Sequence, residues 1–441
     1  MVIILKILQV VIALSILVLV HEFGHFFFAR LFKIRVEKFY LFFDPWFSLF
    51  KYKPKGSDTE YGIGWLPLGG YCKISGMIDE SMDKEALKEE PKPWEFRSKP
   101  AWQRFFVMFG GVFFNFILAI LIYSSTLLAW GEEYLMNKDA VYGVQCNDLA
   151  QEIGFRNGDR ILSVDGATIE KFQNIQIDIA RNQAKTALVV RNGDTTTVNI
   201  NPQYIPAILN TPGMFGLRVP FEILSIPDSS HNYNAGLMPG DRVVGIDSIQ
   251  VSIIQDIQPI LQLHKNDTIN VALSRNGTIF TKSLLVDSLG RLGVLLNSEI
   301  KTFFNVTEVK YSVLNAIPAG AGKTFSTIGN YIKELGLIFS PKTEAYKSVG
   351  SFIAIGNIFP SSWDWQIFWN ITAWLSIMLA VVNLIPIPAL DGGHILFLLY
   401  EIITRRKPSD KFLEYAQFVG MLFLFAIMFL AFGNDIYRLF K

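Results

Sequence analysis

The chain has few cysteines and almost no excess charge, and each shortage excludes a class of protein. Only Cys72 and Cys146 occur among the 441 residues. Two cysteines so far apart in the sequence provide neither a disulfide framework nor a cysteine-based metal site, so we interpret both as unpaired thiols. Lysine and arginine (40 residues) nearly balance aspartate and glutamate (39), and no long basic run occurs. A nucleic-acid partner is therefore not expected.

Apolar residues, by contrast, are abundant, at 51% of the chain with 37 phenylalanines. Segments long enough to cross the roughly 30 Å hydrocarbon layer of a bilayer run from Ile3 to Phe32, Phe105 to Trp130, Trp365 to Ile385 and Phe418 to Phe432. The first is too long for a signal peptide and no cleavage site follows it, so we expect it to stay attached. The sequence predicts a polytopic α-helical membrane protein with about four transmembrane helices in the lipid bilayer.

The connector between the third and fourth predicted spans indicates how the chain is oriented. It reads EIITRRKPSDKFLEY and carries four basic residues. Short loops rich in lysine and arginine lie on the cytoplasmic side, so we place this loop inside. Both termini and the long segment between the second and third spans then lie outside, and residues 33–104 lie inside.

The external segment contains an internal repeat. GFRNGDRILSVDGATI begins at Gly154 and GLMPGDRVVGIDSIQV begins at Gly236. Each copy continues to an Arg-Asn-Gly stretch, at 191–193 and 275–277, which predicts a tight hairpin. The copies resemble tandem PDZ domains, at 140–210 and 211–302, and this resemblance implies that an extended peptide adds to a sheet edge. The alternative is two α/β spacers that bind nothing. The first copy has AQEIGF where the second has NAGL, so its groove is expected to be altered or closed.

The most informative motif lies inside the first apolar span, where HEFGH contains His21, Glu22 and His25. Residues four apart share a helix face, so the two imidazoles point at one ion, and Glu22 is placed to activate a water on it. Two histidines in this pattern are typical of zinc. Each ionisable group in a span costs at least about 2.5 kcal/mol, so three are hard to retain without a use. The alternative is histidines satisfied by hydrogen bonds in the core.

A catalytic zinc needs a third protein ligand, and NLIPIPALDGGHILF near the third span offers one. Its two prolines break the helix, which a membrane interior tolerates only where the backbone faces protein or a wet cavity. We predict Asp391 as the third ligand, and the two glycines after it let the backbone pass close by. His394 is a rival ligand, but we expect it to support the site or to pack rather than to bind.

The HExxH motif, the N-x-x-P-x-P-x-L-D-G motif and the paired repeats coincide in one chain. Together they closely resemble the site-2 protease family of intramembrane zinc metalloproteases, specifically the bacterial regulator-of-sigma-E-protease type. The match runs nearly end to end and includes YGIGWLPLGGYCKISGM, FRSKPAWQRFFVMFGGVFFNFILA and NDIYRL. The resemblance implies that His21, His25 and Asp391 bind Zn2+, that Glu22 is the general base, and that Asn383 helps to hold the substrate backbone.

The resemblance also implies that residues 61–77 form a membrane-reentrant β hairpin whose edge receives an unwound substrate. The alternation of Tyr61, Ile63 and Trp65 independently favours a strand pair, against the alternative of an ordinary cytoplasmic loop. The substrate-contacting residues expected there are Gly64, Trp65, Gly69 and Gly70.

Three further features of the sequence lead to expectations about packing, surface helices and nucleotide binding. Asn115, in the second span, is expected to hydrogen-bond a neighbouring helix as a packing residue. Residues 303–364 are expected to form amphipathic helices along the outer membrane surface. PAGAGKTF resembles a phosphate-binding loop, but Ile317 stands where that pattern needs its first glycine, so no nucleotide is expected.

The resemblance implies hydrolysis of peptide bonds within the transmembrane segments of membrane proteins. Anti-sigma-factor-like proteins and remnant signal peptides are the expected substrates, in the bacterial inner membrane. HExxH lies past the middle of a span that runs inward, so the active site is expected nearer the cytoplasmic side, with the PDZ domains outside as a filter. Alternatives are a membrane-tethered zinc peptidase acting on soluble peptides and a noncatalytic PDZ scaffold.

Overall fold

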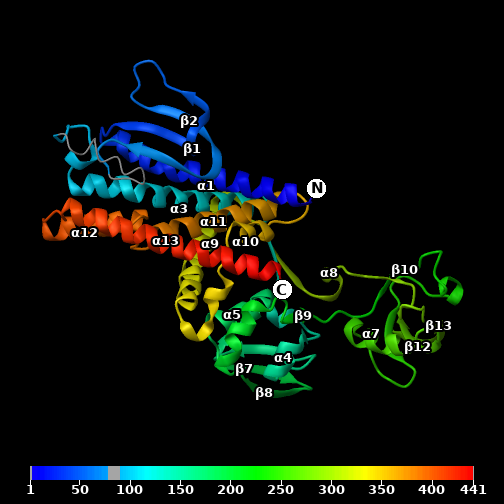
Figure 1. Ribbon diagram of the computed structural model, residues 1–441. Coiled ribbons are helices and arrows are strands. Elements are labelled where there is room, and N and C mark those ends of the chain that lie inside the picture. The colour runs from blue at the N-terminus through cyan, green and yellow to red at the C-terminus, as the bar shows by residue number, and fades with distance from the viewer. Residues whose placement is uncertain (1, 78–89, 441) are drawn as a thin grey trace. The chain divides into compact units, whose positions relative to one another are not determined.

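A computed structural model of the chain describes residues 2–77 and 90–440 (Figure 1). Residues 78–89, part of the segment predicted to lie inside, are outside the described residues. Contacts between α-carbons divide the chain into two compact units. The first comprises residues 1–131, 310–340 and 344–441, and the second comprises residues 132–309 and 341–343.

The first unit is a helical bundle with one small sheet. Its elements are α1 (Val2–Leu31), β1 (Val36–Tyr52), β2 (Glu60–Ile74), η1 (Phe96–Ser98), α3 (Ala101–Trp130), α9 (Val313–Ile338), η7 (Ala345–Ser348), α10 (Phe352–Ile358), α11 (Trp365–Leu384), α12 (Asp391–Thr404) and α13 (Asp410–Leu439).

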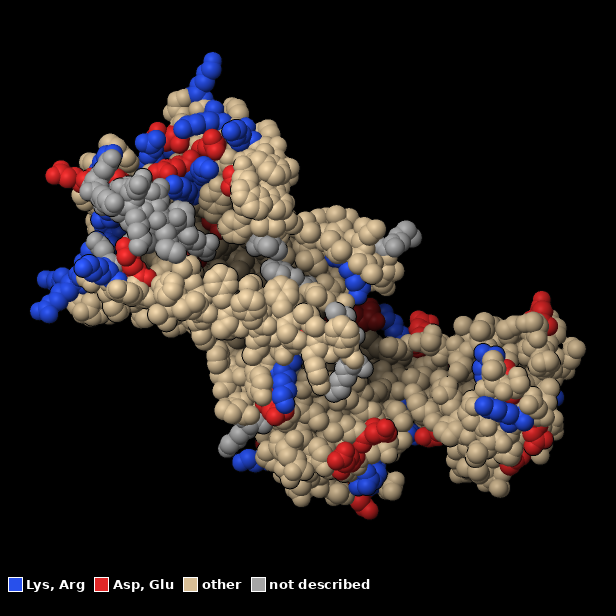
Figure 2. All heavy atoms as spheres, viewed as in Figure 1, with Lys and Arg blue, Asp and Glu red and all other residues tan. Residues whose placement is uncertain are grey.

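Four helices are long and apolar enough to cross a membrane, as predicted. They are α1, α3, α11 and the part of α13 from Lys411 to Tyr437. The fourth is longer than the predicted span 418–432, because the helix continues into more polar sequence at both ends. Figure 2 shows that charged side chains gather over β1 and β2 on the viewed face, whereas few lie over α12 and α13 except near the connector between them.

The predicted break after the third span is present. Helix α11 ends at Leu384 and α12 begins at Asp391, and the loop between them contains both prolines of the motif. A proline cannot donate to a helix, so the two residues end the first helix and leave a short irregular segment before the second. Asp391 therefore stands at the first position of α12 rather than in the middle of a helix.

Strands β1 and β2 form a sheet that folds back on itself. Lys38 is matched with both Lys73 and Glu60, and Leu41 with both Gly70 and Ile63, so this part of β1 has a neighbour on each side. Within the described residues, the register matches residues 70–74 to β1 alone, which leaves their other edge open.

Part of the sequence-based account of this sheet is wrong. β structure is present from Glu60 to Ile74, but the strand pair is not formed within residues 61–77. The partner is β1, for which the sequence analysis predicts no structure. Its aromatic residues do not alternate with polar ones and Pro45 interrupts them, so the usual pattern of a half-buried strand is missing.

Helix α9 differs from the predicted surface helix because it packs into the bundle. Its buried positions include Ala316, Gly320 and Thr324, spaced four apart, so a row of small residues faces α3. Small residues at this spacing let two helices approach closely. Residues 318–325, which resemble a phosphate-binding loop, are continuous helix here. The cluster that joins α9 to α3 and α11 contains Ala119, Ile122, Tyr123, Tyr331, Ala373, Ile377 and Val381.

The second unit contains the two sequence repeats. We define the first repeat as residues 140–217 and the second as residues 218–297. The elements of the unit are β3 (Glu132–Leu135), η2 (Asn137–Asp139), β4 (Val144–Cys146), α4 (Asp148–Ile153), β5 (Arg160–Val164), β6 (Ala167–Thr168), η3 (Phe172–Asn174), α5 (Ile175–Arg181), β7 (Thr186–Arg191), β8 (Asp194–Asn199), η4 (Pro202–Tyr204), α6 (Ile205–Asn210), β9 (Phe215–Leu217), β10 (Ile223–Ser225), η5 (Tyr233–Ala235), β11 (Arg242–Ile246), α7 (Ile254–Leu263), β12 (Thr268–Arg275), β13 (Thr278–Leu285), β14 (Leu295–Leu296), α8 (Ile300–Phe303), β15 (Val306–Val309) and η6 (Pro341–Thr343).

The two repeats share one strand arrangement. The first has the sheet β6-β5-β7-β8 and the pair β4-β9, and the second has the sheet β11-β12-β13 and the pair β10-β14. Because β9 pairs with β4, the boundary between the repeats follows Leu217 rather than residue 210. The helical unit likewise ends at Gly131 instead of residue 139, since β3 pairs with β15.

The repeated sequence motif has a physical cause. Asp159 of the first Gly-Asp-Arg accepts two hydrogen bonds of 2.8 Å from Arg191, the arginine of the Arg-Asn-Gly hairpin. Asp241 of the second copy accepts bonds of 2.7 and 2.8 Å from Arg275 in the same way. Both aspartates are fully buried, so each needs its arginine as a partner. The two short motifs are therefore halves of one buried ion pair.

Candidate active site

Three side chains from two helices meet in the first unit. Helix α1 supplies His21 and His25, and the first residue of α12 supplies Asp391. His21 Nε2 lies 3.1 Å and His25 Nε2 lies 3.4 Å from Asp391 Oδ2, and the two histidine nitrogens are 3.3 Å apart. Among the described residues, these three form the group of histidine, cysteine and acidic residues that could hold a metal ion.

The spacing of these atoms fits zinc. Two ligands at 2.0–2.1 Å from a tetrahedral zinc ion lie about 3.3 Å apart. The three measured separations of 3.1, 3.3 and 3.4 Å are close to that value. Asp391 Oδ2 is also buried without a hydrogen-bond partner among the described residues, an arrangement that is costly unless a cation compensates it.

The other ring nitrogen of each histidine faces α3. His25 Nδ1 lies 2.9 Å from the backbone carbonyl oxygen of Val107. His21 Nδ1 lies 3.2 Å from the side-chain amide nitrogen of Asn115. On the metal side, the amide nitrogen of Asn383 lies 3.3 Å from His21 Nε2, so Asn383 also borders the ligand group.

Glycines bring α3 close enough to make these contacts. A β-carbon on Gly24 of α1 would lie 2.2 Å from the carbonyl oxygen of Gly110, so only glycine allows the two backbones to cross here. A β-carbon on Gly111 would lie 2.6 Å from both His21 Cε1 and His25 Nε2. Any side chain at position 111 would therefore displace the histidines.

A cavity of about 740 Å³ opens over the ligand group. Glu22, Asn383, Gly69, Gly70 and His394 line it together with the three ligands. The open edge of β2 forms one wall through residues 69–74. Cys72 on that edge and Glu22 of α1 line the same cavity, so the carboxylate of the motif lies beside the strand. Cys72 and Cys146 are both free thiols, as predicted.

Two predicted residues lie elsewhere. Gly64 and Trp65 are not among the residues that line the cavity. The indole nitrogen of Trp65 donates to the carbonyl oxygen of Pro45 at 2.8 Å, and its ring stacks on Trp46 and Phe47. Gly64 packs against the backbone of β1. Both lie against residues 42–48 of β1 and outside the cavity lining, although Trp65 is only four residues before Gly69.

The sequence analysis missed two residues that adjoin the ligands. Asn115 is predicted there as a packing residue, but it contacts His21 directly. Gly111 is not singled out at all, although it makes the room that both histidines occupy. The available signal was the GGVFFN stretch, in which a glycine and an amide four residues apart share one face of an apolar helix.

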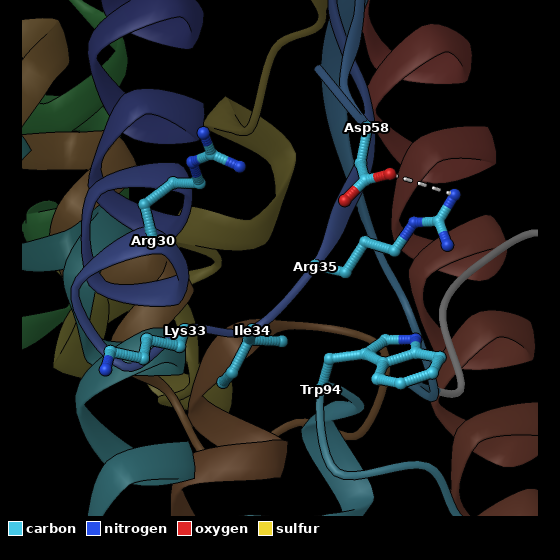
Figure 3. A pocket seen from close by; sticks show the side chains of 6 residues that line it. All are labelled: Arg30, Lys33, Ile34, Arg35, Asp58 and Trp94. Carbon is cyan, nitrogen blue, oxygen red and sulfur yellow. Dashed lines mark ion pairs between the residues drawn. The ribbon is translucent and has the colours of Figure 1, made fainter. Parts of the chain in front are cut away.

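Another cavity lies at the end of α1 (Figure 3). Arg30 and Arg35 reach towards it, Asp58 pairs with Arg35 at 3.5 Å, and the Trp94 indole lies below that pair. Its lining includes a single carboxylate and no histidine or cysteine. A divalent cation has no suitable ligand set there, whereas the cavity over His21 contains a group of residues that could hold a metal ion.

Comparison with known proteins agrees with this geometry. The model of peptidase family M50 matches residues 9–427. The chain belongs to peptidase family M50. This M50 member is 27% identical over 458 residues to the regulator of sigma E protease of Haemophilus influenzae, covering 97% of this chain and 98% of that protein. Proteins that carry the name of a zinc metalloprotease are similar as well. One is from Borreliella burgdorferi, at 28% identity with 95% of both chains covered, and another is from Neisseria meningitidis, at 30% with 98% and 99% covered.

Family membership settles the general chemistry. The M50 chain is a zinc metalloprotease of the site-2 type, and it is a multi-pass membrane protein. The resemblance drawn from the two motifs and the repeats is thereby confirmed at the level of the family. Zinc is the cofactor, as predicted.

Proposed function

We propose that this peptidase hydrolyses peptide bonds within the transmembrane segments of membrane proteins. The observation that carries the proposal is the position of the ligand group. His21, His25 and Asp391 meet on helices that are apolar enough to cross a bilayer, beneath a cavity walled by an open strand edge. A protease built for soluble chains has no need to place three ionisable groups there at the cost of burying them.

His21 Nε2, His25 Nε2 and one oxygen of Asp391 would hold the zinc ion. When bound, zinc supplies a Lewis acid for the scissile carbonyl and lowers the pKa of a water molecule. Glu22 lines the same cavity without belonging to the ligand group, which is the position of a general base in this motif. His394 lines the cavity too and lies one helical turn after Asp391, where it would support the site rather than bind.

The proton transfers follow from the place of Glu22. Its carboxylate takes a proton from the attacking water, whose oxygen forms the new bond to the carbonyl carbon. The same carboxylic acid then gives that proton to the amide nitrogen as the C–N bond breaks, so the carboxylate is restored. Glu22 and Cys72 line the same cavity, so this carboxylate would act beside the strand edge.

A transmembrane helix hides its peptide bonds in its own hydrogen-bond ladder, so the substrate must unwind locally before it can be cut. Strand addition to the open edge of residues 70–74 replaces the lost hydrogen bonds. Gly69 and Gly70 line the cavity at that edge, and their lack of side chains makes room for Phe43, Tyr40 and Val18 of the chain itself. Asn383, beside His21, would hold the extended chain over the ligands.

The two repeats would act as PDZ-like domains on the external side of the bacterial inner membrane. In the second repeat a cavity of about 650 Å³ lies between α7 and residues 289–296, which include β14. A groove between a helix and a strand edge is the place where a PDZ domain adds a peptide strand. The repeats would admit substrates whose external part has been shortened, such as anti-sigma-factor-like proteins or remnant signal peptides, to an active site nearer the cytoplasmic side.

The test is Glu22→Gln in the full chain reconstituted in vesicles. The variant should remain folded and retain zinc by elemental analysis, yet lose cleavage of a membrane-embedded reporter by a factor of at least about 100, the scale of general-base catalysis. Glu170→Gln changes an exposed glutamate of the first repeat and serves as the matched control with unchanged cleavage. Full cleavage by Glu22→Gln contradicts the role of the base.

The same preparation separates the alternatives. A membrane-tethered peptidase for soluble peptides would cut an unstructured peptide and leave the embedded reporter intact. A noncatalytic scaffold would cut neither. Our proposal requires cleavage of the reporter within its transmembrane segment, located by mass spectrometry of the products.

A further inference from the structure

Among the described residues, Asn115 is the one side-chain amide that adjoins the outward nitrogen of a proposed metal ligand. It is fully buried on α3, and its Nδ2 lies 3.2 Å from His21 Nδ1. Its Oδ1 is also buried, and it has no hydrogen-bond partner among the described residues. A buried amide oxygen without a donor is costly and rare, so this arrangement calls for an explanation.

The chemistry of a metal-bound imidazole supplies it. A neutral imidazole carries one proton, and the nitrogen that binds a metal has none. His21 Nε2 faces His25 Nε2 and Asp391 Oδ2, so it is the metal-side nitrogen. The proton of His21 therefore belongs on Nδ1, where it needs an acceptor. The amide nitrogen placed there is a donor and cannot accept it.

Reversing the Asn115 amide gives the His21 proton its acceptor. The oxygen and nitrogen of an asparagine side chain are assigned from the hydrogen-bond network, because the two ends have the same shape. With Oδ1 towards His21, the Nδ1–H donates to an oxygen that is otherwise without a donor. The donor facing a donor thus disappears and Oδ1 gains a donor, while Nδ2 moves to the buried position that Oδ1 had occupied.

The surroundings hold Asn115 in this place. The Ser376 hydroxyl on α11 donates to the backbone carbonyl oxygen of Asn115 at 2.8 Å, which ties this turn of α3 to α11. The neighbouring ligand is supported differently, since His25 Nδ1 donates to the backbone carbonyl oxygen of Val107. The support of His25 is therefore independent of side-chain identity, whereas that of His21 depends on the residue at position 115.

We propose that Asn115 is a positioning residue that accepts a hydrogen bond from His21 Nδ1 through Oδ1 and so fixes the tautomer whose Nε2 binds zinc. The inference rests on the proposed ligand set, but it concerns a residue outside that set. Removing the hydrogen-bond partner of a metal-bound histidine costs about 10–100-fold in metal affinity or activity. Asn115 is expected to act on zinc retention first and on turnover only as a result.

The experiment compares Asn115→Leu with Asn115→Asp in the full chain in detergent. Leucine has a similar size but no acceptor, while aspartate keeps an acceptor oxygen at the same place. Zinc bound at equilibrium is measured by elemental analysis against a series of chelator concentrations. Asn115→Leu should bind zinc about 10–100-fold more weakly, and Asn115→Asp should bind it within a few-fold of the unchanged chain.

Two controls separate positioning from packing. Asn370→Leu removes another amide from a membrane helix, one that contacts Lys323 and not a ligand, and it should leave zinc affinity unchanged. Nitrogen-15 spectra of labelled histidine should place the His21 proton on Nδ1 in the unchanged chain and in Asn115→Asp. Mixed tautomers are expected in metal-free Asn115→Leu. Equal zinc affinity of Asn115→Leu and the unchanged chain overturns the proposal, and so does an Asn115→Asp variant as weak as Asn115→Leu.

Failure of the ligand assignment gives a different result. His21→Ala should lose zinc whatever residue stands at position 115. If His21→Ala keeps full zinc affinity, the proposed ligand set is wrong. If His21→Ala loses zinc while Asn115→Leu does not, the ligand set stands and only the role of Asn115 is rejected.

Discussion

The two repeats share a frame but differ beside their helices. In both, a buried aspartate accepts two hydrogen bonds from a hairpin arginine, Asp159 from Arg191 and Asp241 from Arg275. In the second repeat, the side of α7 next to residues 289–296 opens on a cavity of about 650 Å³. The frame thus permits an open groove beside its helix.

In the first repeat, the helix α5 is tied to the chain beside it. Gln176 of α5 donates to the carbonyl oxygens of Ile208 and Thr211 at 2.8 and 2.7 Å, and its own oxygen accepts from the Met214 amide at 2.9 Å. Three bonds from one side chain fasten α6 and the segment before β9 against α5. A peptide could add there only after these bonds break.

The comparison shows that the Gly-Asp-Arg motif indicates the shared fold of the two repeats. The motif does not indicate whether the groove beside the helix is open. Gly-Asp-Arg and the hairpin arginine are retained in both copies because a buried carboxylate without its cation is costly. Gln176, whose hydrogen bonds hold α6 and the segment before β9 against α5, lies outside this motif. Substrate recognition by the pair is therefore expected to come mainly from the second repeat.

The largest expected effect tests the shared frame. Asp159→Ala and Asp241→Ala should each lower the free energy of unfolding of their own repeat by about 3–5 kcal/mol, because each leaves an arginine without its buried partner. Hydrogen exchange at β7 and β12 measures the two effects separately. Asp228→Ala, in the second repeat, is the control with a change within about 0.5 kcal/mol. A large effect at only one of the two sites would show that the frames are not equivalent.

A smaller effect should separate the repeats. Gln176→Leu leaves two carbonyl oxygens and one amide without their partner, so the first repeat should lose about 1–3 kcal/mol. Gln258→Leu changes an exposed residue of α7 in the second repeat and should stay within about 0.5 kcal/mol. Hydrogen exchange at α6 and β14 is the measurement. Equal losses of unfolding free energy in Gln176→Leu and Gln258→Leu would contradict the inference that the first repeat is closed beside its helix and the second is open.

Peptide binding should distinguish the first repeat from the second. Gln258→Trp places an indole in the cavity of the second repeat, and binding of ten-residue peptides with apolar ends should weaken at least about tenfold, or 1.4 kcal/mol. Ile177→Trp, at an exposed position of α5, should not change it because the hydrogen bonds of Gln176 tie α5 to the chain beside it. Fluorescence anisotropy with labelled peptides measures both. Binding lost in Ile177→Trp and kept in Gln258→Trp would reverse the assignment.

Acid should produce the smallest change. Burial alone would raise the pKa of Asp241, but the hydrogen bonds from Arg275 and from the Met238 amide outweigh it and hold the pKa below the usual value. A carboxylate with a lowered pKa stabilises the fold above its unfolded pKa of about 3.9 and loses that contribution as the pH falls through the folded pKa. The free energy of unfolding of the second repeat should therefore fall below pH about 4. In Arg275→Ala this acid-dependent fall should become smaller, because only the Met238 amide then opposes the effect of burial.

Much of the site follows from sequence because it depends on local geometry. His21 and His25 share a face in any α-helix, so their convergence needs no tertiary information. Asp391 is predictable because prolines that break an apolar span have few uses other than a site. The four spans follow for a similar reason, since their length and composition suffice.

The parts that sequence missed depend on long-range contacts. Pairing between β1 and β2 is set by the register of two strands whose aromatic residues show no clean alternation. The support of His21 by Asn115 joins residues 94 positions apart, and a lone amide in an apolar helix does not say which neighbour it will meet. Helix α9 carries an amphipathic pattern, and only its row of small residues indicated burial against α3.

The open edge of residues 70–74 beside the ligand group has a pharmacological consequence. A rigid helical mimic of a substrate would present no free amide or carbonyl to that edge. An extended peptidomimetic could form hydrogen bonds with the strand edge. A hydroxamate placed where the scissile bond lies could bind the zinc ion at the same time. Inhibitor design against this enzyme should therefore start from β-strand scaffolds, even though the substrates proposed above are transmembrane helices.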